Sequence, residues 1–203
     1  MSDKIAFIIG NGKSRQAVDL SSLVGKGTIF GCNALYREFE EFNYLVAIDD
    51  RMIKELSSVA TYEPHILSRG QMLIPPEDER WESAEYSPQR RRSNAGMNAM
   101  LEAIRREHNI LYCLGFDFIL EGEKSIENVF AGTKNYEPNT RSNTSDNYFR
   151  VRYCDWFVNQ HEHVKFVFVI PDNVATKPMQ SENIIGRSEE RRVGKECRSR
   201  WWS

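Results

Sequence analysis

The hydrophobic residues of this chain fall into short continuous runs separated by polar stretches. Runs rich in apolar, β-branched and aromatic residues predict strands, and their lack of alternation indicates burial on both faces of a sheet. By this pattern we predict strands at 4–10, 28–33, 44–50, 65–75 (with a break at Gly70), 110–118 and 164–171.

Helical patterns lie between these runs, at 49–59, 93–107 and 146–160. In the second, apolar residues recur at helical spacing and charged residues lie opposite. In the third the buried stripe is aromatic, and we interpret it as core packing rather than as a cofactor site. Alternation of strands and helices predicts an α/β fold, a Rossmann-like open and mostly parallel sheet with helices on both faces. Ligands of such sheets bind at the carboxyl ends of the strands.

Two polar, turn-rich segments, 75–92 and 121–145, interrupt this alternation. Loops of this length are usually active-site lids or disordered segments. We interpret residues 1–186 as a single nucleotide-binding domain that carries these two loops.

The last residues have a different character. "RSEERRVGKECRSRW" resembles a common sequencing adapter translated in frame, so we interpret residues 187–203 as read-through from a metagenomic assembly. The rival interpretation is a basic arm that binds nucleic acid. Without this tail, which holds six Lys/Arg and three Asp/Glu, the formal net charge changes from −2 to −5. A mildly acidic chain argues against a broad nucleic-acid surface.

Composition fits one globular domain. The chain has 203 residues, 40% hydrophobic and 28% charged, and no run approaches the roughly 20 apolar residues of a membrane span. The start, "MSDKIAFIIG", has no signal-peptide pattern, so we expect a cytoplasmic protein.

The cysteines lack metal-type spacing, and Cys32 and Cys113 fit small core residues. The oligomeric state stays open, a homo-oligomer included.

The stretch "AFIIGNGKSRQAVDL" at 6–20 invites comparison with phosphate-binding loops. A P-loop would need a further glycine at the place of Phe7, and the dinucleotide fingerprint would need its third glycine at Arg15. What remains is a strand, a glycine turn and the start of a helix. That geometry suits an anion, because the first turn of a helix offers unpaired N–H groups. A strand-to-helix turn without a ligand is the alternative.

Carboxamides, hydroxyls and glycines gather just after the predicted strands and before the second helix. They are Gly10, Asn11, Gly12, Ser14, Asn33, Asp49, Ser93, Asn94, Gly96, Gly115 and Asp117. Such groups hydrogen-bond sugars and bases, but each one alone could equally be a helix cap or a turn residue. Asp49 and Asp50 could hold Mg²⁺, although no His or Cys lies near them in the sequence, and no Ser-His-Asp triad is supported.

These motifs resemble those of family-42-type bacterial sialyltransferases. "IIGNGKSRQAVDLSSL…IFGCNALY" is similar to their "GNGPS" turn and later "CN", and "SNAGMNAMLEAI…NILYCLGFDF" to their "SG…A" helix and the strand ending "GIDF". The turn also resembles the "GxGPS" of an archaeal family of pterin pyrophosphokinases. The resemblance covers most of residues 4–120.

For a sialyltransferase-like chain the resemblance implies a CMP-sugar donor bound at the first turn and at the "CN" asparagine. Asn11, Ser14 and Asn33 would then contact nucleotide or phosphate. Residues 93–96 and 115–117 would line the same cleft. Lys13 stands where the family has proline.

The family's histidine base has no counterpart, because the corresponding region reads "NTRSNTSDNYF". Asp146 is the nearest ionisable substitute, and Tyr136 and Tyr148 are candidate phosphate ligands that would stabilise the departing nucleotide. We therefore favour glycosyl transfer from a nucleotide-sugar to a glycan or other hydroxyl acceptor, with no required cofactor. The alternatives are an Mg²⁺-dependent pyrophosphokinase-like enzyme using Asp49 and Asp50, a non-catalytic nucleotide-binding protein and, more weakly, a SAM-dependent methyltransferase.

Overall fold

The structure is a computed structural model that describes residues 3–59, 66–67, 94–122, 127–138, 144–170, 172 and 174–189. At 66–67, 144–146, 148 and 185–189 it describes the backbone without the side chains. The predicted loop at 75–92 lies outside the described residues.

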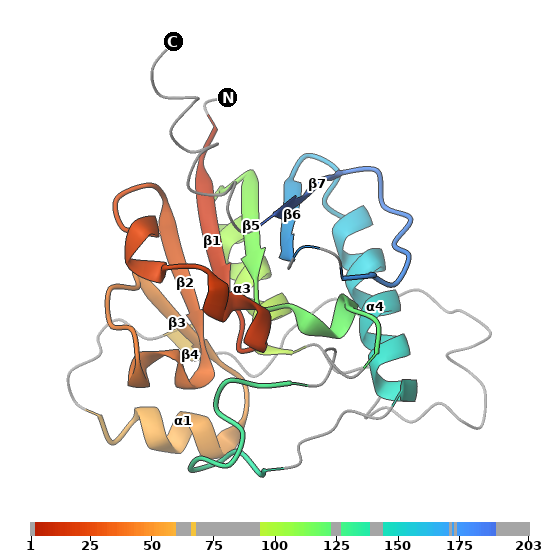
Figure 1. Ribbon diagram of the computed structural model, residues 1–203. Coiled ribbons are helices and arrows are strands. Elements are labelled where there is room, and N and C mark those ends of the chain that lie inside the picture. Colours follow the sequence, from red (N-terminus) through yellow and green to blue (C-terminus); the bar gives the residue numbers. More distant parts are fainter. Residues whose placement is uncertain are drawn as a thin grey trace.

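The described strands form one seven-stranded sheet in the order β4-β3-β2-β1-β5-β6-β7, and each neighbouring pair is parallel (Figure 1). The strands are β1 (Ile5–Ile9), β2 (Thr28–Cys32), β3 (Tyr44–Ala47), β4 (Ile66–Leu67), β5 (Ile110–Leu114), β6 (Lys165–Ile170) and β7 (Ile184–Glu189). The α/β prediction with a mostly parallel sheet is confirmed. Five of the six predicted strands are present, although those predicted to end at 50 and 118 end at Ala47 and Leu114. Of the strand predicted at 65–75, residues 66–67 form β4 and the rest lies outside the described residues. The strand β7 was not predicted.

Three α-helices occur in the described residues: α1 (Asp50–Leu56), α3 (Ala95–Arg105) and α4 (Thr144–Asn159). They match the three predicted helices to within a few residues, and α4 begins inside the segment predicted as a loop up to residue 145. The helix expected after β1 is a short 3₁₀ segment, η1 (Lys13–Ala17). Further 3₁₀ segments are η2 (Leu20–Leu23), η3 (Asn33–Arg37) and η5 (Asp117–Ile119). None of the helices in the described residues is long and apolar enough to cross a membrane.

Both faces of the sheet are covered. In β1, Ala6 and Ile8 face one cluster and Phe7 and Ile9 the other, and all four are fully buried. The first cluster includes residues of α3 and α4, and the second those of η2, η3 and α1. Burying each large apolar side chain stabilises the fold by about 1.5–3 kcal/mol. Because β1 is buried on both faces, its residues are apolar throughout and do not alternate with polar ones.

The direction of strand addition changes at β1. The chain adds β2, β3 and β4 on one side of β1, then passes through α3 and places β5 on the other side. In Figure 1, α1 and the segment 127–138 lie at the lower end of the sheet, where the strands end. This switch point is where open parallel sheets bind ligands.

Two backbone stretches come unusually close at this point. The Gly10 N–H donates to the Leu114 carbonyl at 2.8 Å, and the Gly12 N–H to the Gly115 carbonyl at 3.0 Å. A Cβ on Gly10 would lie 2.6 Å from the Gly115 oxygen. Gly115 also has a φ of +68°, a backbone conformation that glycine adopts more readily than residues with a side chain. The glycines after β1 and β5 therefore allow the two strand ends to join directly.

Residues 187–189, which the sequence analysis assigns to adapter read-through, pair with β6 as the second half of β7. The proposed single domain of residues 1–186 remains a proposal. The predicted loop 121–145 contains an organised part, since the Val129 N–H donates to the Asn11 carbonyl at 2.9 Å and Asn128 bridges to Gly12.

Candidate functional site

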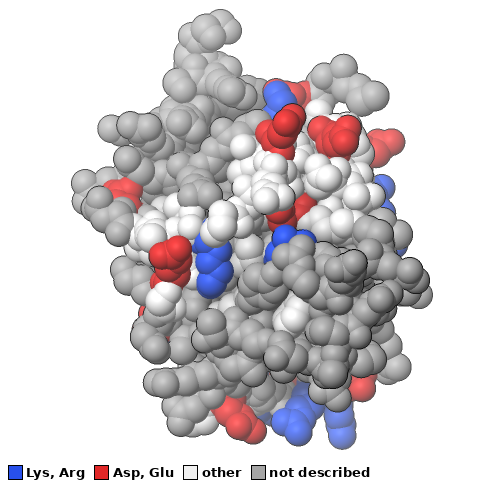
Figure 2. Space-filling model, turned by 90° about the vertical axis from the view of Figure 1, so that its right-hand side faces the viewer, with Lys and Arg blue, Asp and Glu red and all other residues white. Residues whose placement is uncertain are grey.

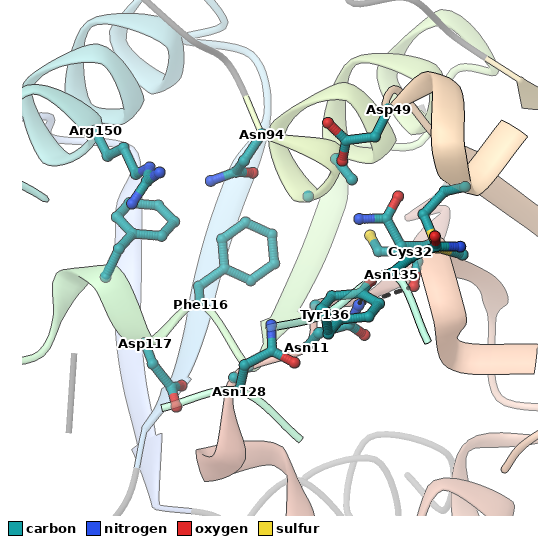
Figure 3. Close-up of a pocket in the computed structure, with 18 of the residues that line it drawn as sticks. Asn11, Cys32, Asp49, Asn94, Phe116, Asp117, Asn128, Asn135, Tyr136 and Arg150 are labelled. Carbon is teal, nitrogen blue, oxygen red and sulfur yellow. Dashed lines mark hydrogen bonds between the residues drawn. The ribbon is translucent and has the colours of Figure 1, made fainter. Parts of the chain in front are cut away.

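A cleft of about 620 Å³ opens at the carboxyl ends of the central strands. Its walls come from the first turn, the residues after β2, β3 and β5, the start of α3, the segment 127–138 and α4 (Figure 3). The residues selected from the sequence that line it are Gly10, Asn11, Gly12, Asn33, Asp49, Asn94, Gly96, Gly115, Asp117 and Tyr136. Distant parts of the chain thus meet at one edge of the sheet, as parallel strands require.

The floor of the cleft presents two carboxamides. Asn11 Nδ2 donates to the Cys32 carbonyl at 3.2 Å and to the Tyr136 hydroxyl at 3.4 Å. The Oδ1 atoms of Asn11 and Asn33 are buried and have no hydrogen-bond partner in the described structure. Leaving a buried acceptor unmatched costs about 1–3 kcal/mol. The two oxygens therefore suit a ligand that brings hydrogen-bond donors.

Asn33 and Tyr136 have unusual local environments. Asn33 adopts a φ of +50° as the chain leaves β2, a conformation that asparagine tolerates better than most residues. Burial raises the pKa of Tyr136 to about 12, against smaller lowering effects of hydrogen bonds from the Ala34 backbone and Asn11. The Tyr136 hydroxyl therefore keeps its proton at neutral pH.

Asp117 occupies the anion position that the sequence analysis assigned to a ligand phosphate. Its carboxylate accepts the Ser14 backbone N–H at 3.0 Å and the Ser14 hydroxyl as well. Burial raises the pKa of Asp117, and the two hydrogen bonds from Ser14 offset part of that rise. Gly12 makes room for it, because a Cβ there would lie 2.3 Å from the Asp117 Cγ. The start of η1 is therefore already occupied by a carboxylate of the protein.

The start of α3 forms another wall. Asn94 caps the helix by accepting the Met97 N–H at 2.9 Å. Gly96 packs against Phe116, whose ring would lie 2.7 Å from a Cβ at that position. Helix starts attract anions through unpaired N–H groups and the helix dipole. The start of this 11-residue helix therefore favours a negatively charged ligand group.

Arg150 brings a positive charge from α4. In Figure 3 it lies on the same side of the cleft as Asp117, across from Asp49 and Asn135. Arg150 also donates to Asn147 Oδ1 at 3.2 Å. Together with the start of α3, its guanidinium makes this side of the cleft suitable for a phosphate.

Other selected residues stand apart. Ser14 does not line the cleft, and its polar groups bond Asp117. Ser93 lies outside the described residues. Asp146 and Tyr148 belong to the first turns of α4, where only the backbone is described. Their roles as base and phosphate ligand remain predictions.

Several residues that line the cleft were not predicted from the sequence: Cys32, Glu127, Asn128, Asn135 and Arg150. Phe116 belongs to the range 115–117 that was predicted to line it, and it does so. Asn128 and Asn135 fell in a segment treated as a loop, and Arg150 in a helix from which only Asp146, Tyr148 and the aromatic stripe were considered.

Metal binding has little support in the described part of the chain. Asp49 and Asp50 both line the cleft. No group of three or more His, Cys, Asp or Glu residues that could hold a metal ion occurs among the described residues. Mg²⁺ dependence therefore rests on this aspartate pair alone.

Charge on the surface is mixed. On the face shown in Figure 2, acidic and basic side chains of the described residues are interspersed. Nucleic-acid-binding domains instead gather Lys and Arg on one face. The described residues on this face form no such basic patch.

Comparison with known proteins gives one informative result. No protein-family model matches the chain, and no curated protein matches it. Among solved structures, a variant of the sialyltransferase CST-II in complex with CMP superposes with a TM-score of 0.53 at 15% identity, covering 96% of this chain and 99% of that chain. The chain has a sialyltransferase-like fold. A variant of the alpha-2,3/8-sialyltransferase CstII has a TM-score of 0.46 at 16% identity, covering 90% of each chain.

Proposed function

We propose that this protein is a glycosyltransferase that binds a nucleotide-activated sugar, preferably CMP-linked, and transfers the sugar to a hydroxyl acceptor such as a glycan. The observation that carries the proposal is the pair of buried, unpartnered oxygens, Asn11 Oδ1 and Asn33 Oδ1, in the sheet-edge cleft. Ribose hydroxyls and the amino group of cytosine are hydrogen-bond donors of the kind these oxygens need.

The phosphate of the donor would lie on the other side of the cleft, between the start of α3 and Arg150. The Arg150 guanidinium carries a full positive charge, and the start of the helix carries a partial one. The first turn is a poorer place for it than the sequence suggested, since Asp117 already accepts the Ser14 groups there. Fold similarity to a sialyltransferase in complex with CMP supports the choice of a CMP-linked donor.

Catalysis would depend on positioning and on stabilising the departing nucleotide. The Tyr136 hydroxyl accepts the Asn11 amide at 3.4 Å and keeps its own proton, since burial raises its pKa to about 12. The hydroxyl can therefore donate to the bound nucleotide. Deprotonation of the acceptor hydroxyl falls to Asp146 in this proposal, in the place of the histidine that the resembling family uses.

Calorimetric titration with CMP, UMP, GMP and Mg²⁺-ATP tests the proposal. We expect CMP to bind most tightly and, at a hundred times its dissociation constant, to stabilise the fold by about 2.7 kcal/mol. Asn11→Ala and Asn33→Gly should weaken CMP binding; glycine preserves the positive φ of Asn33. The matched control is Asn159→Ala, which changes an exposed asparagine at the end of α4.

Release of CMP from a CMP-linked sugar, measured with and without a glycan acceptor, then tests the transferase step. Preferential binding of Mg²⁺-ATP, lost in Asp49→Ala and Asp50→Ala, would favour the pyrophosphokinase-like alternative. Tight CMP binding with no release of CMP would favour a non-catalytic nucleotide-binding protein.

A further inference from the structure

Glu55 lies in α1 outside the cleft, yet it connects three segments that line the cleft. Its side chain is 6% exposed. One carboxylate oxygen, Oε1, accepts the Tyr36 hydroxyl, Arg37 Nε at 3.1 Å and Arg37 Nη2 at 2.6 Å. The other, Oε2, accepts Asn135 Nδ2 at 2.6 Å and lies 3.8 Å from Lys134 Nζ. A buried carboxylate is tolerated only when it is paired in this way.

Each segment held by Glu55 contains or adjoins a residue that lines the cleft. Its own helix, α1, follows Asp49. The segment η3 begins at Asn33 and ends at Arg37. The segment 127–138 carries Asn135 and Tyr136. A shift of Glu55 would therefore be transmitted to three walls of the cleft at once.

Arg37 strengthens the connection to the segment 127–138. Its Nη1 donates to Thr133 Oγ1 at 2.8 Å and its Nη2 to the Lys134 carbonyl at 2.9 Å. The guanidinium carbon also lies 5.9 Å from the ring centroids of Phe130 and Tyr136, within the range of a cation–π interaction. The Arg37–Glu55 pair thus reaches this segment through polar and aromatic contacts.

Besides its contacts with Arg37, the segment 127–138 has one attachment near its beginning and one near its end. Near its beginning, the Val129 N–H donates to the Asn11 carbonyl at 2.9 Å. Near its end, the bond to Glu55 holds Asn135, whose φ of +67° is unfavourable for a residue with a side chain. The second attachment fixes the backbone immediately before Tyr136.

We infer that Glu55 is a positioning residue of the proposed nucleotide site, which holds Asn135 and Tyr136 in their binding geometry without touching the ligand. The inference rests on the proposed function for its effect on binding, and on the structure alone for its effect on the segment 127–138.

Glu55→Gln tests it, because glutamine keeps the shape but places an amide opposite the Asn135 amide or the Arg37 guanidinium. We expect the dissociation constant of CMP to rise about tenfold, or ~1.4 kcal/mol, with kcat for CMP release falling less than kcat/KM. Amide hydrogen exchange in 127–138 should be faster than in the wild type. The matched control is Glu102→Gln, which removes a carboxylate paired with the half-exposed Arg105 at 3.1 Å.

Asn135→Gly gives an independent route, since glycine accepts the positive φ and removes the bond to Glu55. If Glu55 acts through Asn135, the two substitutions together should weaken CMP binding by less than the sum of their separate effects. Additive losses would overturn the inference. If Glu55→Gln does not fold, Asn135→Gly takes its place in the CMP titration and in the hydrogen-exchange measurement.

Hydrogen exchange separates this inference from the proposed function. If the wild type binds no CMP, the proposed function fails, and the exchange measurement still decides whether Glu55 holds the segment 127–138. Unchanged exchange there in folded Glu55→Gln, or unchanged CMP binding, would overturn the positioning role.

Discussion

The Asp117 carboxylate accepts the backbone N–H of Ser14 at 3.0 Å, joining the turn after β5 to the turn after β1. The two residues follow β1 and β5, which pair directly in the sheet. The sequence suggested that the turn after β1 binds a phosphate. In the structure, the Asp117 carboxylate accepts the hydrogen bonds that a phosphate would accept there.

Asp117→Ala should lower the free energy of unfolding by about 1–3 kcal/mol, because the Ser14 N–H would lose its buried acceptor. Ser14→Ala removes one of the two bonds and should cost less, about 0.5–1.5 kcal/mol. Urea denaturation measures both. Glu41→Ala, at an exposed position, should change stability by less than ~0.5 kcal/mol. Equal stability of Asp117→Ala and the wild type would mean that another donor or acceptor replaces the carboxylate.

Gly115→Ala should be more destabilising than Gly122→Ala. Both glycines have a φ near +70°, at +68° and +70° respectively, so the backbone cost of about 1–2 kcal/mol is shared. The two glycines differ in the room available for a side chain. A Cβ on Gly115 would lie 2.9 Å from the Gly10 oxygen, whereas nothing lies within 4 Å of a Cβ on Gly122. Thermal unfolding of the two variants isolates the contact with Gly10. Equal losses would show that the strand ends can separate without cost.

The stabilising effect of Glu55 should depend on pH. Burial alone would raise the pKa of Glu55, but hydrogen bonds from Tyr36 and Arg37 hold it below the ordinary value of 4.5. A lowered pKa means that the folded state favours the ionised form, so the stabilisation is complete above pH 4.5 and is lost as the pH falls through the folded-state pKa.

Urea denaturation of the wild type and of Glu55→Gln over a series of pH values checks this expectation. The wild type should be more stable by a constant amount near neutrality, and the difference should shrink in acid. A difference that grows as the pH falls below 4.5 would contradict the lowered pKa.

Arg150→Met should weaken binding of CMP roughly tenfold or more, because a charge-assisted hydrogen bond contributes about 1.5–3 kcal/mol. Binding of cytidine, which lacks the phosphate, should hardly change. Calorimetry with both ligands makes the comparison, and Arg105→Met on the half-exposed end of α3 is the control. Equal weakening for CMP and cytidine would place Arg150 away from the phosphate.

A chain ending at Gly186 should be as stable, to within ~0.5 kcal/mol, as one ending at Glu189, if residues 187–203 are read-through. The structure makes this a sharp comparison, because residues 187–189 pair with Phe168, Val169 and Ile170 at the edge of the sheet. A larger loss on thermal unfolding would show that these residues belong to the fold.

Local sequence patterns were sufficient for most of the fold. The apolar run at 4–10 is buried on both sides, so it predicted β1 correctly. The run after it did not become an α-helix. Lys13–Ala17 forms a 3₁₀ segment instead, and the Ser14 N–H within it donates to Asp117. That outcome depends on a residue far away in the sequence, which no local pattern reports.

The candidate site was predictable only in part for the same reason. Glycines and asparagines at strand ends follow from the rule that parallel strands share an edge, and they line the cleft. Asn135 and Arg150 also line the cleft, but they do not follow strands, so no rule of this kind predicts their position. The contact of Glu55 with Arg37 and Asn135 depends on how α1 packs against η3, which the sequence does not reveal.

The reversal of strand addition at β1 has a consequence for the protein during its synthesis on the ribosome. A nascent chain that stops after β4 holds Asn11, Asn33 and Asp49 but lacks the whole opposite wall, which arrives only with α3, β5 and Arg150. Fragments that lack either half should not retain the ligand. Nucleotide binding, once observed, would therefore report that synthesis has passed α4 and that both halves have docked.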